Sequence, residues 1–172
     1  MLDSFFRGQD RLVQNFFVFY YRSYQDTYTY KELVDELNIS YPVLNNVLEQ
    51  VEDIQREYPE FMIKRDNKEI QVVFSERFLL NKIRVNLTKA TLLYTIWDAI
   101  FYQKFKSLEA FSQSQYVSGR TVQRQIGTFA PILDQYKLEL NLKKSEYLVG
   151  EEYRIRYFFH SFYWHVYDEI ES

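Results

Sequence analysis

Residues 118–124 bring together side chains that can hydrogen-bond to nucleic-acid bases. An arginine can donate two parallel hydrogen bonds to guanine, a glutamine can pair with adenine, and a threonine can contact a base or a phosphate. The candidates for these contacts are Ser118, Arg120, Thr121, Gln123 and Arg124. This set of residue types predicts an element that reads base edges in the major groove of double-stranded DNA.

The same segment has the periodicity of an amphipathic helix. At about 100° per residue, Arg120 and Arg124 lie almost opposite an apolar arc, with Gln123 beside them. The apolar arc consists of Val122, Ile126, Phe129 and Leu133. We therefore expect a long helix that begins after an N-cap at Ser118 and runs towards Tyr136. Periodicity alone leaves an alternative open, namely a helix with a solvated basic face and no ligand.

Charge is distributed unevenly along the chain, whose net charge is −3. Residues 77–145 hold 11 Lys or Arg and 4 Asp or Glu, whereas residues 26–76 hold 5 and 12. The two net charges are therefore +7 and −7. Such a basic segment indicates a surface for a polyanion, unless the charges are simply solvated. Lys106, Lys143 and Lys144 are expected to neutralise DNA phosphates from the flanks of the predicted helix.

A second candidate helix lies in the acidic half, where residues 44–51 carry an apolar stripe. The candidate DNA contacts of this half are Tyr41, Asn45, Asn46, Lys64 and Lys68. Asparagines can pair with adenine, and tyrosine and lysine can contact phosphates. Glu49 and Asp53 follow on the same face, and phosphates would repel them. This half either contacts DNA, packs against the second half or serves another partner.

The first half has clear signals for three helices and a hairpin. A helix is expected over residues 10–24, and Thr29 forms a capping box with Glu32 for a second helix. Ser40 caps a third helix. The hairpin strands are expected at residues 61–64 and 70–74, joined by a five-residue turn. Three helices followed by a hairpin is the order of a winged helix-turn-helix domain.

The second half is expected to repeat this order without sequence identity. Its expected elements are a helix from Thr88 to about Gln103, a short helix with Leu108 and Phe111, the helix from Ser118, a hairpin pairing residues 138–140 with 147–149, and a helix over 151–167. The fold class predicted is mainly α with short β-hairpin wings, as two tandem winged helix-turn-helix domains. The predicted domains are residues 1–77 and 78–172.

Several classes of protein are not favoured by the sequence. The chain has no Cys, and His160 and His165 are placed about 140° apart on one helix, so no metal site, catalytic residue or cofactor is expected. No Gly-rich phosphate loop or hydrolase motif is present. Without a signal peptide or an apolar span, we expect a cytoplasmic protein with no membrane contact. The sequon-like segment Asn86-Leu87-Thr88 is interpreted as a turn and helix start.

The C-terminal segment resembles a known family. Residues 148–158, LVGEEYRIRYF, resemble the G-x-E-x-x-I-R-y-F signature of the Mga/AtxA family, virulence-associated regulators of Gram-positive bacteria. Phe162-Tyr163-Trp164 resembles the second half of that signature. Tyr116-Val117-Ser118, with Thr121 and Arg124, is similar to the family's second helix-turn-helix, and Leu33, Leu37 and Ser40 to its first. The resemblance covers almost the whole chain.

The resemblance implies two winged-helix domains that bind promoter DNA, often A+T-rich, to activate transcription. In such regulators, phosphotransferase-regulation domains and a dimerising domain follow. We expect a homodimer only through those domains, so the chain is either an N-terminal fragment or a short relative. Two alternatives stay open: a plasmid replication initiator, which also uses paired winged helices, and a protein-interaction module that recruits a partner such as RNA polymerase.

Overall fold

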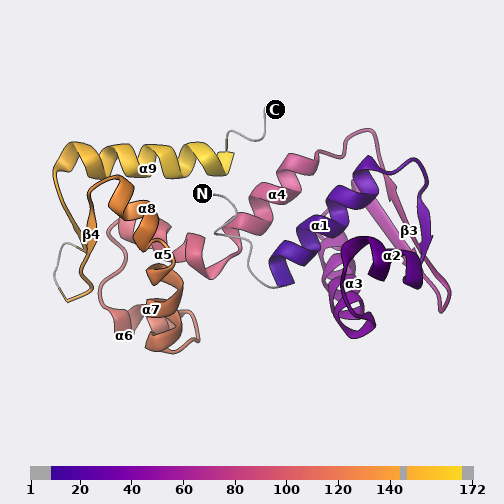
Figure 1. Ribbon diagram of the computed structural model, residues 1–172, viewed down its shortest axis with the longest axis horizontal. Coiled ribbons are helices and arrows are strands. Elements are labelled where there is room, and N and C mark those ends of the chain that lie inside the picture. Colours follow the sequence, from indigo (N-terminus) through magenta and orange to yellow (C-terminus); the bar gives the residue numbers. More distant parts are fainter. Residues whose placement is uncertain (1–8, 144–146, 168–172) are drawn as a thin grey trace. The chain divides into compact units, whose positions relative to one another are not determined.

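A computed structural model describes residues 9–143 and 147–167 of the chain. It is mainly helical and has two small antiparallel sheets, which confirms the predicted content of helices and short hairpins (Figure 1). The described residues up to Arg84 form one compact unit, and those from Val85 form a second. Helix α4 (Leu80–Lys89) crosses this division.

The first unit contains three helices and a three-stranded sheet. Its elements are α1 (Gln9–Arg22), β1 (Thr27–Thr29), α2 (Tyr30–Leu37), α3 (Tyr41–Gln55), β2 (Phe61–Arg65) and β3 (Glu69–Phe74). The predicted hairpin is confirmed, although its turn spans three residues rather than five because both strands extend further. Strand β1 was not predicted. It pairs antiparallel with β3, with Tyr28 opposite Ile70, so the sheet has the order β1-β3-β2.

Local capping interactions begin α2 and α3. The predicted capping box is confirmed, since the Thr29 hydroxyl accepts the Glu32 backbone N–H at 3.1 Å and the Glu32 carboxylate accepts the Thr29 N–H at 3.3 Å. Ser40 caps α3 as predicted by accepting the Val43 N–H at 3.4 Å. These bonds satisfy backbone donors that have no partner within the helix.

The core of the first unit is built largely from aromatic side chains. Phe17 on α1 lies edge-to-face on Phe61 of β2, with ring centroids 5.1 Å apart. The buried Tyr20 hydroxyl donates to the Ile70 carbonyl oxygen of β3 at 2.7 Å. Burial raises the pKa of Tyr20, because the phenolate would lose its hydration. These contacts fix α1 against the sheet.

The elements of the second unit, after α4, are α5 (Leu92–Phe101), α6 (Leu108–Ser114), α7 (Gly119–Gly127), α8 (Ala130–Gln135), β4 (Glu139–Leu140), β5 (Leu148–Val149) and α9 (Glu152–Tyr167). The predicted hairpin is confirmed by the pairing of Leu140 with Leu148. The predicted last helix is confirmed as α9.

The prediction of a helix from Thr88 was wrong. Asn86-Leu87-Thr88 lies inside α4 rather than in a turn, and Thr91, not Thr88, is the N-cap of α5. The Thr91 hydroxyl oxygen accepts the Tyr94 N–H at 3.2 Å and donates to the Thr88 carbonyl oxygen at 2.7 Å. Thr91 therefore joins the end of one helix to the start of the next.

The predicted long helix from Ser118 is interrupted. Helix α7 ends at Gly127, and α8 begins at Ala130 with Pro131 in its first turn. Proline has no backbone N–H, and its ring would clash with the carbonyl four residues earlier if one helix continued. Because of this break, Phe129 and Leu133 lie beyond the end of α7, but both are still buried.

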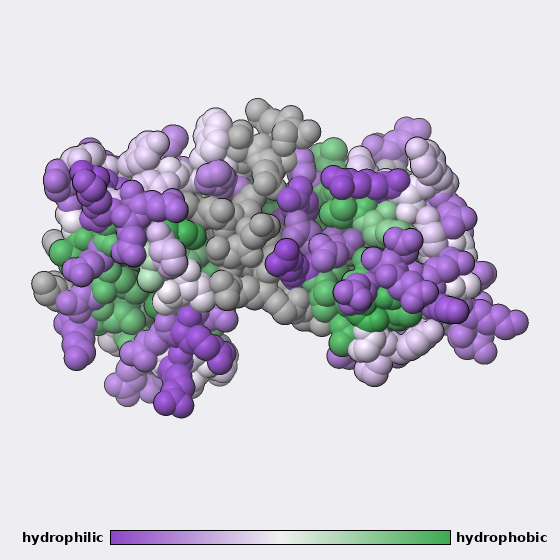
Figure 2. Space-filling view, in the orientation of Figure 1, coloured by the Kyte–Doolittle hydropathy of each residue, from purple (hydrophilic) through white to green (hydrophobic). Residues whose placement is uncertain are grey.

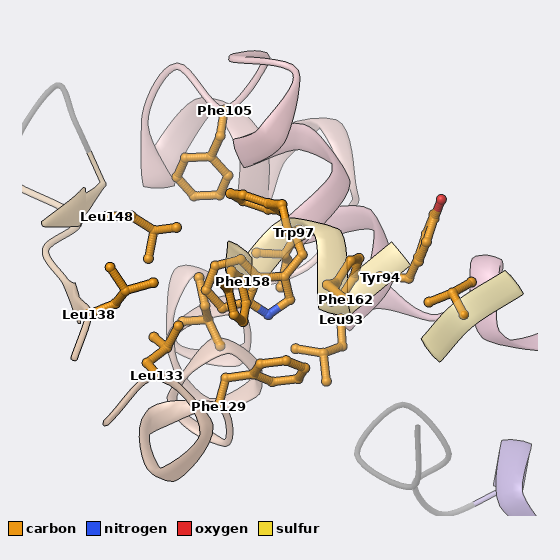
Figure 3. Close-up of a cluster of buried hydrophobic side chains, with 14 of the residues drawn as sticks. Leu93, Tyr94, Trp97, Phe105, Phe129, Leu133, Leu138, Leu148, Phe158 and Phe162 are labelled. Atoms are coloured by element: carbon orange, nitrogen blue, oxygen red, sulfur yellow. The ribbon is translucent and has the colours of Figure 1, made fainter. Parts of the chain in front are cut away.

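Trp97 on α5 lies at the centre of the second core (Figure 3). It is completely buried and contacts the rings of Phe129, at 5.3 Å between centroids, and Phe158 on α9, at 5.1 Å. Helix α9 is also tied to α5 by a hydrogen bond of 2.7 Å, which the Tyr163 hydroxyl donates to the Asp98 carboxylate. Helices α5, α8 and α9 therefore share one aromatic core.

We expect Trp97→Ala to lower the free energy of unfolding by about 3–5 kcal/mol, because it leaves a large cavity in this core. Urea denaturation would measure the loss. The matched control is Trp164→Ala, since Trp164 is 56% exposed and its loss should cost about 0.5 kcal/mol or less. Equal effects of the two changes would contradict the central role of Trp97.

Candidate nucleic-acid interface

Helices α6 and α7 and the turn between them form a helix-turn-helix. Ser107 starts α6 by accepting the Ala110 N–H at 3.0 Å, and Phe111 on α6 is buried against Phe105. Helix α7 packs against both α5 and α6. Its contribution to the core is Val122 and Ile126, which are almost completely buried.

The turn between the two helices is held by backbone and side-chain hydrogen bonds. The Val117 N–H donates to the Ser112 carbonyl oxygen at 3.1 Å. Ser118 is the N-cap of α7, as predicted, and accepts the Thr121 N–H at 3.1 Å. The hydroxyl oxygens of Ser118 and Thr121 are 2.9 Å apart. The first turn of α7 is therefore fixed at the point that would enter a groove.

The opposite face of α7 presents a polar, positively charged surface. Arg120, Gln123 and Arg124 are exposed, and Thr121 is half-buried beside them. Within the part of the chain that the structure describes, neither Arg120 nor Arg124 forms an ion pair. Figure 2 shows hydrophilic side chains over the region of α6 and α7. The guanidinium groups are thus available to an external acceptor.

Lys106 and Lys143 belong to two segments that contact each other. Lys106 lies in the segment before α6, and Lys143 lies in the β4–β5 hairpin. The hydroxyl of Tyr147, the residue before β5, donates to the Lys106 carbonyl oxygen at 2.7 Å. Lys106 is exposed, and so is Lys143 in the hairpin loop. Lys144, the third predicted flanking lysine, lies outside the described residues. Sequence reasoning missed Lys104, which is also exposed, although it alternates with Lys106 around the buried Phe105.

The first unit has a comparable pair of helices, α2 and α3, with a different electrostatic surface. Tyr41, Asn45 and Asn46 are exposed on α3, as their predicted role requires. Glu49 and Asp53 are exposed as well, and Asp53 forms an ion pair of 3.4 Å with Arg56. The acidic end of α3 is therefore a poor surface for a polyanion.

The β2–β3 hairpin carries the two predicted lysines of the first unit. Lys64 and Lys68 are exposed. The Asp66 carboxylate orders the turn by accepting the backbone N–H groups of Lys68, at 2.7 Å, and Glu69, at 2.9 Å. These hydrogen bonds favour the ionised form and lower the pKa of Asp66. Lys68 therefore lies at the tip of an ordered turn.

No helix among the described residues is long and apolar enough to cross a membrane. Nor does the described part of the chain contain three histidine, aspartate or glutamate side chains arranged to hold a metal ion. His160 is exposed and stacks on Trp164, with ring centroids 6.1 Å apart.

A family model described as the Mga helix-turn-helix domain matches residues 76–163. The matched region is about half of the chain, and it contains α6, the turn, α7 and the β4–β5 hairpin. The resemblance to the Mga family is thereby confirmed over residues 76–163. Comparison with curated proteins found no match.

We expect Ser118→Ala to lower the free energy of unfolding by about 1 kcal/mol, because the cap of α7 is lost. Ser118→Asp should keep most of the stability, since a carboxylate caps a helix and favours its N-terminus. The same carboxylate should weaken DNA binding by repelling phosphates. Urea denaturation would measure the stability, and fluorescence anisotropy with labelled DNA would measure the affinity. A Ser118→Asp variant that is folded and binds DNA with wild-type affinity would argue against this interface.

Proposed function

The chain belongs to the Mga helix-turn-helix family, and on this premise we propose that it regulates transcription by binding double-stranded promoter DNA with α7 in the major groove. Members of this family are non-catalytic, DNA-binding transcriptional regulators. Ser118, Arg120, Thr121, Gln123 and Arg124 would contact bases and nearby phosphates. Lys106, Lys143 and Lys144 would contact the backbone on the flanks.

The availability of Arg120 and Arg124 carries this proposal. Both side chains lie on an exposed face of a capped helix and have no carboxylate partner among the described residues. An arginine that is already paired would have to break its ion pair before binding DNA. A free guanidinium group on a fixed helix binds without that cost.

The first unit would bind DNA as well. Its order of elements, helix–strand–helix–helix–hairpin, supports a first winged helix-turn-helix domain over residues 1–77, in tandem with a second over 78–172. Tyr41, Asn45 and Asn46 of α3 and Lys64 and Lys68 of the hairpin would add contacts to DNA. Because Glu49 and Asp53 are exposed nearby, these contacts are weaker than those of α7 in this proposal.

The regulator would act in the cytoplasm as an activator of virulence-type genes. Activation would require an encounter with RNA polymerase. Such a contact is supported by exposed aromatic side chains of α9, namely Tyr153, Tyr157 and Trp164, and by the exposed carboxylates of Glu49 and Asp53 on α3. Self-association would depend on further domains of the kind that follow this region in other family members.

We expect the double change Arg120→Ala with Arg124→Ala to weaken binding to a long A+T-rich duplex at least tenfold. The slope of log K against log salt concentration should also fall by about 1–2, because fewer counterions are released. Mobility-shift titrations at several salt concentrations would measure both quantities. The control is Arg156→Ala, which removes an exposed arginine of α9 that is paired with Glu152. Wild-type affinity and slope in the double variant would refute the role of α7.

The contribution of the first unit can be measured by itself. Changing Asn45 and Asn46 together to Ala should weaken binding less than the arginine changes and leave the salt slope unaltered, because amides are neutral. The same titrations would measure this, with Asn81→Ala on α4 as the control. No loss of affinity would show that α3 does not contact the DNA.

A further inference from the structure

The two helix-turn-helix motifs have the same turn, built from different residues. Asn38-Ile39-Ser40 joins α2 to α3, and Tyr116-Val117-Ser118 follows the C-cap of α6, Gln115, and leads into α7. The first residue of each three-residue segment is left-handed, with φ of 53° at Asn38 and 56° at Tyr116. The second donates its N–H to a carbonyl of the preceding helix at 3.1 Å, and the third is the N-cap.

Asparagine and tyrosine, the residues at the first position, differ in how readily they adopt this left-handed conformation. Asparagine is among the non-glycine residues that adopt left-handed backbone angles most readily. Tyrosine is bulky, and its Cβ is forced close to the following carbonyl oxygen, so it is strained at the same φ. The first unit shows that this turn forms with asparagine. Tyr116 is therefore not required by the turn itself.

No side-chain contact among the described residues compensates for the strain at Tyr116. Its side chain is 95% exposed, so it buries almost no apolar surface. Its phenol ring and hydroxyl have no ring contact or hydrogen bond with any other described residue. A strained residue without a structural role indicates a function outside the fold.

The position of Tyr116 identifies the chemistry of its partner. Tyr116 is two residues before Ser118, so its Cα lies within about 7 Å of the N-cap of α7. When the first turn of a recognition helix enters the major groove, residues just before it lie at the groove edge, where the phosphates are. A neutral phenol donates one hydrogen bond, and phosphate oxygens accept such bonds from tyrosine.

We propose that the Tyr116 hydroxyl donates a hydrogen bond to a phosphate oxygen of the DNA at the edge of the groove occupied by α7. This inference rests on the proposed function and adds a contact that sets the depth and register of α7. Because the phenol is neutral, the contact releases no counterion. Loss of this contact should therefore lower the affinity for DNA without changing its salt dependence, whereas loss of Arg120 and Arg124 should change both.

Two variants separate the hydroxyl from the backbone strain. Tyr116→Phe removes only the hydroxyl, so the melting temperature should stay as in the wild type. Tyr116→Asn also relieves the strain and should raise the melting temperature by about 2–5 °C. Both should weaken binding to the A+T-rich duplex about tenfold without changing the salt slope. Scanning calorimetry and anisotropy titrations would measure the two quantities.

The matched controls are Tyr24→Phe and Tyr24→Asn, which alter a fully exposed tyrosine between α1 and β1 and should leave affinity unchanged. Wild-type affinity in Tyr116→Phe would overturn the proposed hydrogen bond, and a loss confined to Tyr116→Asn would assign the contact to the ring instead. In either case salt-dependent binding by the wild type would leave the proposed function standing. A wild-type chain that does not bind the duplex would overturn both.

Discussion

Helix α7 has 9 residues, which is too few for a helix to be stable in water without tertiary contacts. It persists because Val122 and Ile126 are buried in the aromatic core around Trp97, and because the Ser118 hydroxyl accepts the Thr121 N–H in its first turn. The same packing decides which side chains face solvent. With the apolar face fixed inward, Arg120 and Arg124 point outward, and the basic surface follows from the burial of two aliphatic residues.

The electrostatic difference between the two units explains how an acidic chain can bind a polyanion. Net charge governs behaviour at long range, but at about 0.15 M salt the Debye length is about 8 Å. A DNA phosphate bound at α7 would therefore respond mainly to the charges nearest to it, those of Arg120 and Arg124, rather than to the net charge of the chain. On α3, Glu49 and Asp53 are exposed within one helix, so repulsion there acts at contact distance. The turns before α3 and α7 are similar, but the exposed face of α3 carries carboxylates and that of α7 carries arginines.

Aromatic side chains provide the rigidity that a small helix-turn-helix needs. Each unit has fewer than about 100 residues, a size at which the core is limited. Rings such as Phe17, Phe61, Trp97 and Phe158 each bury a large area and meet mostly edge-to-face or tilted. Tyrosines at the edges of these cores add hydrogen bonds, as Tyr147 does between the second hairpin and the segment before α6. The hairpin, with Lys143, is thereby fixed near the helix-turn-helix.

The sequence by itself determined the features that arise between near neighbours. The caps at Thr29, Ser40 and Ser118 and the arginine face of α7 depend on residues three or four positions apart, so periodicity and capping chemistry were enough to predict them. Only the tertiary structure decided that β1 pairs with β3, that Thr91 rather than Thr88 starts α5, and that Arg120 and Arg124 have no carboxylate partner among the described residues. Strand pairing and ion pairing join residues far apart in the chain, and alternative helix starts are selected by which side chains the shared core buries.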